Sequence, residues 1–147
     1  MAANFLNFPI INGFASGGSA KPELDGDNLI SLNSILSVSV ATTGAAGSEV
    51  TKITLQLSPT ALTNDTCVVT VSESSDAVDP DGGAPYVGSD NAAGHAAYNA
   101  KLRSAVMKAM TANPGGVKST VVAPQSQVSS AKWMSDKSVY FKDFVVS

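Results

Sequence analysis

Two neighbouring segments in which apolar and polar residues alternate constrain the fold of this chain more than any other feature. In residues 35–40 the apolar residues are separated by Ser37 and Ser39, and residues 50–57 show the same alternation. A period of two is typical of a β-strand that buries one face. The predicted inner face consists of Leu36, Val38, Val40, Ile53, Leu55 and Leu57. Because a Gly-containing turn at residues 44–47 joins the two segments, we predict an antiparallel hairpin.

Five other segments have the branched and aromatic composition of strands. They are residues 5–14, 29–32, 67–71, 117–123 and 139–146. The first of them contains Pro9, which has no backbone N–H to donate to a sheet ladder. We therefore expect the first strand to lie at a sheet edge or to contain a bulge.

One amphipathic helix is predicted over residues 92–113. Its apolar residues have helical spacing and form a single stripe, which comprises Tyr98, Leu102, Ala105, Val106, Ala109 and Met110. Asp90 or Asn91 can cap the first turn, and the helix ends before Pro114. One helix cannot bury this stripe alone, so we expect it to pack on the sheet. The predicted fold class is α+β, an antiparallel β-sheet of about five to seven strands packed by this helix.

The length of 147 residues matches a single structural domain that spans residues 1–147. Residues 72–94 differ from the rest because they are rich in Ser, Asp, Gly and Pro and have little periodicity. We predict a long exposed loop there. Loops of this length in compact domains are usually functional or mobile.

The low charge of the chain bears on its partners. Charged residues make up 14% of the sequence, whereas soluble domains typically have about 25%. A weakly charged surface resists association poorly, which favours a subunit that is covered by copies of itself or by a partner. The net charge of −3 and the scattered basic residues argue against nucleic acid. No apolar run approaches the roughly 20 residues that would span a membrane.

Residues that could support catalysis are few. Cys67 lies in an apolar strand-like run, where we expect a buried thiol, and His95 has no nucleophile beside it in the sequence. One Cys and one His cannot supply the four ligands of a structural zinc site. We predict that the chain is not an enzyme and has no catalytic, cofactor-binding or metal-binding residues.

The acidic residues of the 72–94 segment raise one alternative. Asp76, Asp79 and Asp81 supply carboxylates of the kind that bind calcium, but their spacing does not match an EF-hand loop. A solvated acidic loop is the preferred interpretation. A small carbohydrate- or calcium-binding module that uses this loop remains an alternative function.

The segment 139–146 has apolar residues on both faces. A strand of this kind is either central in its own sheet or covered by a neighbouring subunit. For the second case the predicted assembly interface is Tyr140, Phe141, Phe144 and Val146. Both interpretations stay open on the sequence alone.

Three segments together resemble a type of small structural protein from the virions of marine and cyanobacterial tailed phages. They are residues 4–10 with 27–30, the Thr/Ser-rich hairpin 35–57, and the helix from Tyr98 through Pro114 to Val117. The resemblance covers about two thirds of the chain, without the 72–94 segment and the aromatic C-terminal segment. It implies a non-enzymatic protein and transfers no functional residues.

The resemblance and the low charge together predict a virion structural protein. We expect a capsid decoration (cement) subunit, made in the host cytoplasm and located in the virion. A tail or tail-tube subunit is the alternative within the same class. The expected partners are a capsid or tail protein of the same virion and further copies of the chain, with neither nucleic acid nor membrane.

Overall fold

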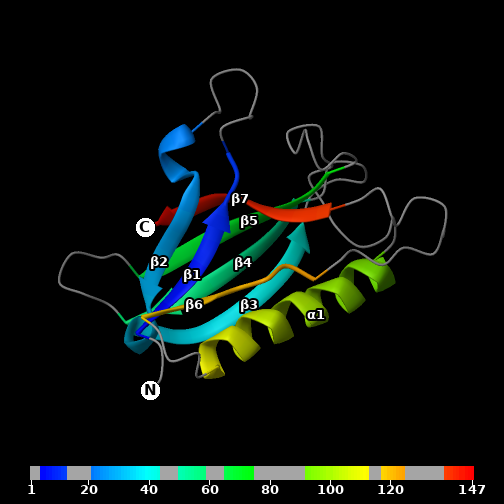
Figure 1. Ribbon diagram of the computed structural model, residues 1–147. Coiled ribbons are helices and arrows are strands. Elements are labelled where there is room, and N and C mark those ends of the chain that lie inside the picture. Colours follow the sequence, from blue (N-terminus) through cyan, green and yellow to red (C-terminus); the bar gives the residue numbers. More distant parts are fainter. Residues whose placement is uncertain are drawn as a thin grey trace.

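The computed structural model describes residues 4–12, 21–43, 50–58, 65–74, 92–112, 117–124 and 138–147. Its strands are β1 (Phe5–Ile10), β2 (Gly26–Ser31), β3 (Ile35–Thr43), β4 (Val50–Leu57), β5 (Thr66–Ser74), β6 (Lys118–Thr120) and β7 (Ser138–Val146), and its α-helix is α1 (Ala92–Thr111). Two short 3-10 helices, Pro22–Leu24 and Leu32–Ser34, flank β2. The elements form an α+β fold in which α1 packs on the sheet (Figure 1), and this confirms the predicted class.

The strands form one sheet in the order β2-β1-β7-β5-β4-β3, and β6 also pairs with β1. The pairs β1–β2, β3–β4, β4–β5 and β5–β7 are antiparallel, as the sequence predicts. The pairs β1–β6 and β1–β7 are parallel, so the sheet is mixed and not purely antiparallel. Parallel strands need a long crossover connection, which the chain between β1 and these two late strands supplies.

The two strands of the predicted hairpin pair antiparallel, and the second buries the expected face. The turn predicted at residues 44–47 lies outside the described residues. Ile53, Leu55 and Leu57 of β4 are buried, and Val38 of β3 lies opposite Leu55 in the register. On the other side of β4, Leu55 lies opposite Cys67. These residues belong to one core cluster, in which rows of apolar side chains run across the strands.

The prediction that Leu36 faces inward is wrong, because its side chain is 64% exposed. The register of β3 against β4 shifts between Ile35 and Ser37, which marks a bulge at this point. Ile35 lies opposite Leu57 and packs against the core, so it takes the inward place that simple alternation gives to Leu36. A bulge adds one residue to a strand and reverses the faces on one side of it.

The expectation that the first strand lies at a sheet edge or contains a bulge is also wrong, because β1 lies between β2 and β7 and pairs with β2 without a register shift. On the side away from β2, the N–H groups of Phe5 and Ile11 donate to Val117 (3.1 Å) and Phe141 (2.9 Å). Pro9 is odd-numbered like Phe5 and Ile11, so its nitrogen points to the same side of the strand. It lies between the end of the β6 pairing at Asn7 and the β7 pairing at Ile10, where no ladder bond is needed.

Helix α1 packs mainly on β3 and also contacts β6 (Figure 1). The predicted stripe is confirmed, since Tyr98, Leu102, Val106 and Ala109 are buried, with Ala105 and Met110 half-buried beside them. The Tyr98 hydroxyl donates to the carbonyl of Pro124 (2.7 Å), which ties the helix to the segment after β6. The helix ends at Thr111, and both the predicted caps and Pro114 lie outside the described residues.

Candidate interaction site

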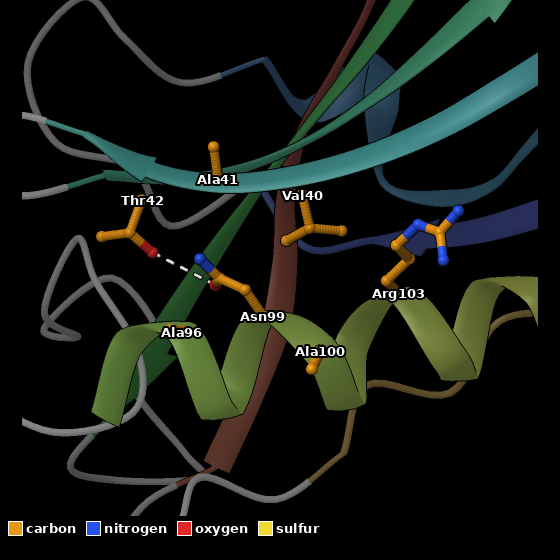
Figure 2. A pocket seen from close by; sticks show the side chains of 7 residues that line it. All are labelled: Val40, Ala41, Thr42, Ala96, Asn99, Ala100 and Arg103. Atoms are coloured by element: carbon orange, nitrogen blue, oxygen red, sulfur yellow. Dashed lines mark hydrogen bonds between the residues drawn. The ribbon is translucent and has the colours of Figure 1, made fainter. Parts of the chain in front are cut away.

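A groove of about 500 Å³ lies between β3, the strand at one edge of the sheet, and the N-terminal half of α1 (Figure 2). The strand contributes Val40, Ala41 and Thr42, and the helix contributes Ala96, Asn99, Ala100 and Arg103. The groove is open to solvent along the edge of the sheet. It therefore exposes strand backbone as well as side chains.

The backbone groups of β3 that face this edge can be identified from the residues of β4 that hydrogen-bond to β3. The N–H of Leu57 donates to Asp65 on the β5 side (2.7 Å), and the N–H of Ser58 donates to Ser34 on the β3 side (2.7 Å). Even-numbered residues of β4 therefore bond to β3. Their partners in the register are odd-numbered, as Ser39 is opposite Thr54. In an antiparallel ladder both backbone groups of a residue point to the same side.

The even-numbered residues Val38, Val40 and Thr42 consequently point their N–H and C=O groups away from the sheet. An independent contact agrees with this orientation, because the Nε of Arg103 donates to the carbonyl of Val38 (3.1 Å). Within the described part of the chain, the backbone groups of Val40 and Thr42 on this side have no hydrogen-bond partner. They form an open edge two residues long.

The helix wall of the groove consists of a row that flanks the buried stripe. Ala96, Ala100 and Arg103 are spaced at i, i+4 and i+7, so they lie on one side of the helix. All three are exposed, and the two alanines leave room beside the strand. Of the described residues that line the groove, Arg103 alone carries a charge.

A short chain of polar side chains links the two walls of the groove. The Thr42 hydroxyl donates to Asn99 Oδ1 (3.2 Å) and lies 2.7 Å from the buried Thr51 hydroxyl. Because a hydroxyl has only one proton, Thr51 must donate to Thr42. Figure 2 shows Asn99 reaching from the helix toward Thr42, which fixes the distance between the two walls.

The structure places the predicted assembly residues in a central strand, since β7 lies between β5 and β1. Phe141 is buried in the core, where its ring meets Phe8 edge-on with centroids 5.3 Å apart. Tyr140 is also buried, on the opposite face of the strand. Phe144 is half-buried against the core, whereas Val146 is 39% exposed. An assembly role for this set remains a prediction, and the exposed part of it is Val146.

Cys67 is fully buried, as predicted, and burial in apolar surroundings raises the pKa of its thiol to about 12. A thiol with such a pKa is protonated at neutral pH and has little nucleophilic character. Cys67 therefore serves as a small core residue.

His95 and the acidic residues of the 72–94 segment are the remaining candidates for chemistry. His95 lies in the first turns of α1. The ends of the predicted 72–94 loop belong to β5 and α1, and its acidic residues lie outside the described residues. Among the residues that the structure describes, there is no group of three or more His, Cys, Asp or Glu side chains that could hold a metal ion.

A polar cluster around the buried Asn7, which the sequence analysis missed, ties β1, β2 and β6 together. The side chain of Asn7 is 1% exposed; its Nδ2 donates to Asp27 Oδ1 and Thr120 Oγ1 (both 3.0 Å), and its Oδ1 accepts from the N–H of Asn28 (3.1 Å). Lys118 Nζ donates to the other oxygen of Asp27, and these hydrogen bonds lower the pKa of that carboxyl group. The polar groups are satisfied within the chain, so the cluster has a structural role.

By its fold and its groove, the chain is an α+β domain with a mixed sheet, and one edge strand of this sheet lies open beside a helix. Comparisons with protein-family models, with curated proteins and with solved structures find nothing that matches this chain. Among the described residues, no helix is long and apolar enough to cross a membrane.

Proposed function

We propose that the chain is a virion structural protein, a capsid decoration (cement) subunit that stabilises a phage head through protein–protein contacts. The resemblance of its segments to small virion proteins of tailed phages suggests that the chain belongs to a phage virion. The observation that carries the proposal is the open edge of β3, because a free strand edge is a template for pairing with another chain.

The composition of β3 supports this reading. Natural edge strands are usually protected by charges, prolines or short length. β3 has nine residues and contains neither a charged residue nor proline. At the other end of the sheet, β2 has six residues and includes Asp27, which pairs with Lys118. The unprotected edge is thus confined to one side of the sheet.

Exposed apolar side chains at the end of the sheet where β3 begins point in the same direction. Val117 is 62% exposed, and its carbonyl accepts from Asn4, whose own carbonyl accepts from Leu32. These bonds bring Val117 to the end at which Leu36, 64% exposed, enters β3. Covering such side chains by a neighbouring subunit stabilises an assembly by about 25 cal/mol per Å² of apolar area.

The proposal is tested on the particle. Heads and tails separated from virions of the phage that encodes the chain are mixed with the purified protein and sedimented. We expect binding to heads, and we expect heads without the protein to release DNA at a lower temperature. Heads of an unrelated tailed phage are the control. If the protein is missing from purified virions and binds neither fraction, the proposal is wrong.

A tail or tail-tube subunit is the second candidate, because an open strand edge also suits copies that join sheet to sheet. The same sedimentation experiment separates the two, since this candidate predicts binding to the tail fraction only. Light scattering of the isolated protein at high concentration adds a second readout. Closed rings of the chain alone would favour the tail.

A further inference from the structure

We propose that the groove between β3 and α1 takes up an extended segment of a partner protein, which pairs with β3 as an additional strand and places a carboxylate on Arg103. This inference names the contact by which the proposed assembly would form, and so it rests on the proposed function. The occupant is defined by its chemistry: extended, with small or branched apolar side chains and one acidic group.

The backbone of β3 supplies the pairing groups. Val40 and Thr42 each present one N–H and one C=O at the open edge, and these groups have no partner in the described part of the chain. An extended segment satisfies groups of this kind by strand addition, in which main-chain bonds give affinity and alternate side chains give specificity. The two neighbouring edge groups of Val38 mark where this stretch ends, because Arg103 already occupies the Val38 carbonyl.

The helix wall supplies the side-chain pocket. In an added strand every second side chain would face α1, since successive residues of a strand point to opposite faces. There it meets Ala96 and Ala100, whose small exposed side chains leave the groove of about 500 Å³ open. Branched apolar side chains such as Val or Ile would fill this space. The helix wall therefore selects an apolar residue at these positions.

The charge at the end of the groove selects the acidic group. Arg103 uses Nε for the Val38 carbonyl, which orients the guanidinium, and its Nη groups make no hydrogen bond within the described part of the chain. A guanidinium fixed in this way is suited to a carboxylate, which it binds with two parallel hydrogen bonds. A second copy of β3 contains no acidic residue and would leave Arg103 unmatched. Charge complementarity thus favours a different partner over self-pairing.

The test uses the whole chain and short fluorescent peptides with blocked ends, in which Thr and Val alternate and one Glu stands at either end. Matched peptides carry Gln in place of Glu. Fluorescence anisotropy should show that the chain prefers one of the Glu peptides over its Gln counterpart. The end at which Glu is preferred gives the direction of the added strand.

Two variants change the groove at exposed positions. Ala100→Phe fills it and should weaken peptide binding at least about tenfold. Arg103→Gln should lower the affinity for the preferred Glu peptide by about two- to fivefold and leave the Gln peptide unchanged, as expected for an exposed ion pair. Lys101→Gln, a neighbouring exposed position outside the groove, is the matched control and should change neither affinity. Circular dichroism checks that each variant is folded.

Three outcomes with the isolated chain overturn the proposal. The first is that the peptides do not bind at millimolar concentration. The second is that they bind equally well to Ala100→Phe. The third is that the peptides do not bind but the chain forms dimers that Ala100→Phe abolishes, which would assign the groove to a second copy. Sedimentation of Ala100→Phe with heads separates this inference from the proposed function. Normal head binding by a folded Ala100→Phe would reject the groove and leave the decoration role intact.

Discussion

Leu102 shows most directly how the helix is held on the sheet, because its side chain is completely buried. Leu102→Ala should lower the free energy of unfolding by about 2–5 kcal/mol, since it removes buried methyl groups and leaves a cavity. Urea denaturation measures the change. The neighbouring exposed Lys101→Ala should stay within about 0.5 kcal/mol. A similarly small loss for Leu102→Ala would mean that the stripe does not form the core.

Because of Cys67, the free energy of unfolding should fall as the pH rises in the alkaline range. Its thiol ordinarily has a pKa of 9.0, and burial raises the pKa to about 12. Between these values the unfolded chain has lost the proton that the folded chain still holds. The stabilising effect is therefore complete below pH 9.0 and is lost as the pH rises toward about 12.

The expected slope is a loss of about 1.4 kcal/mol per pH unit relative to a chain without the thiol. Urea denaturation of the natural chain and of Cys67→Ala across this range isolates the effect, because all other titrating groups are shared. Parallel pH profiles for the two proteins would show that the thiol is not shielded from water in the folded state.

At the scale of the element, proline substitutions can test which residues of β3 direct their N–H groups into the sheet and which direct them to the open edge. Ser39 directs its N–H into the sheet toward Thr54, whereas Val40 directs its N–H to the open edge. Ser39→Pro should cost about 1–3 kcal/mol more than Val40→Pro, because only the former removes a ladder hydrogen bond and leaves a buried acceptor without its donor. Thermal and urea denaturation rank the two. The reverse ranking would place the free edge on the other set of residues.

The central position of β7 leads to a second test at this scale. Phe144 packs against the core with its ring 6.3 Å from Phe8, while Val145 lies on the other face and is 42% exposed. Phe144→Glu should destabilise the chain by at least about 3 kcal/mol, since it removes a large apolar contact and places a carboxylate against the core. Val145→Glu should cost less than about 1 kcal/mol.

Far-UV circular dichroism during urea titration measures both variants. A stable Phe144→Glu protein that no longer binds phage heads would support the assembly interpretation of this side chain. Loss of stability in Phe144→Glu alone would assign Phe144 to the core of the monomer.

For the whole molecule, calcium separates the structural role from a binding-module role. We expect the same melting temperature in calcium and in EDTA for the natural chain and for the double variant Asp79→Asn/Asp81→Asn. A ligand that binds only the folded state raises stability by mass action. A calcium-dependent rise in melting temperature that the double variant lacks would favour the binding module over the virion protein.

The elements of the fold were predictable because they depend on local periodicity. The alternation of Ile53, Leu55 and Leu57 predicts β4, and the stripe that includes Leu102 predicts α1. The exposure of Leu36 could not be predicted in this way, because the bulge is set by the pairing with β4. The interior position of β1 depends on how β6 and β7 share its far side.

The groove was not predictable for a related reason. It requires contact between β3 and α1, whose bridging residues Thr42 and Asn99 are 57 positions apart in the sequence. Two signals were nevertheless present. One is a long strand pattern without charges in residues 35–43, and the other is the row of small residues beside the helix stripe, Ala96 and Ala100. Neither indicates a site until both are placed side by side.

The position of β7 also determines the order in which the molecule can be completed during synthesis. β7 is the last of the described strands along the chain, yet it joins β1–β2 to β3–β4–β5 in the middle of the sheet (Figure 1). Until residues 138–146 leave the ribosome, the strands β1–β2 and the strands β3–β4–β5 form two separate groups without the strand that joins them. The nascent chain then exposes pairing edges on β1 and β5 that the finished protein hides. The sheet can therefore be completed only late in synthesis, and folding yield should depend on chaperones that protect the edges of β1 and β5 until β7 has been made.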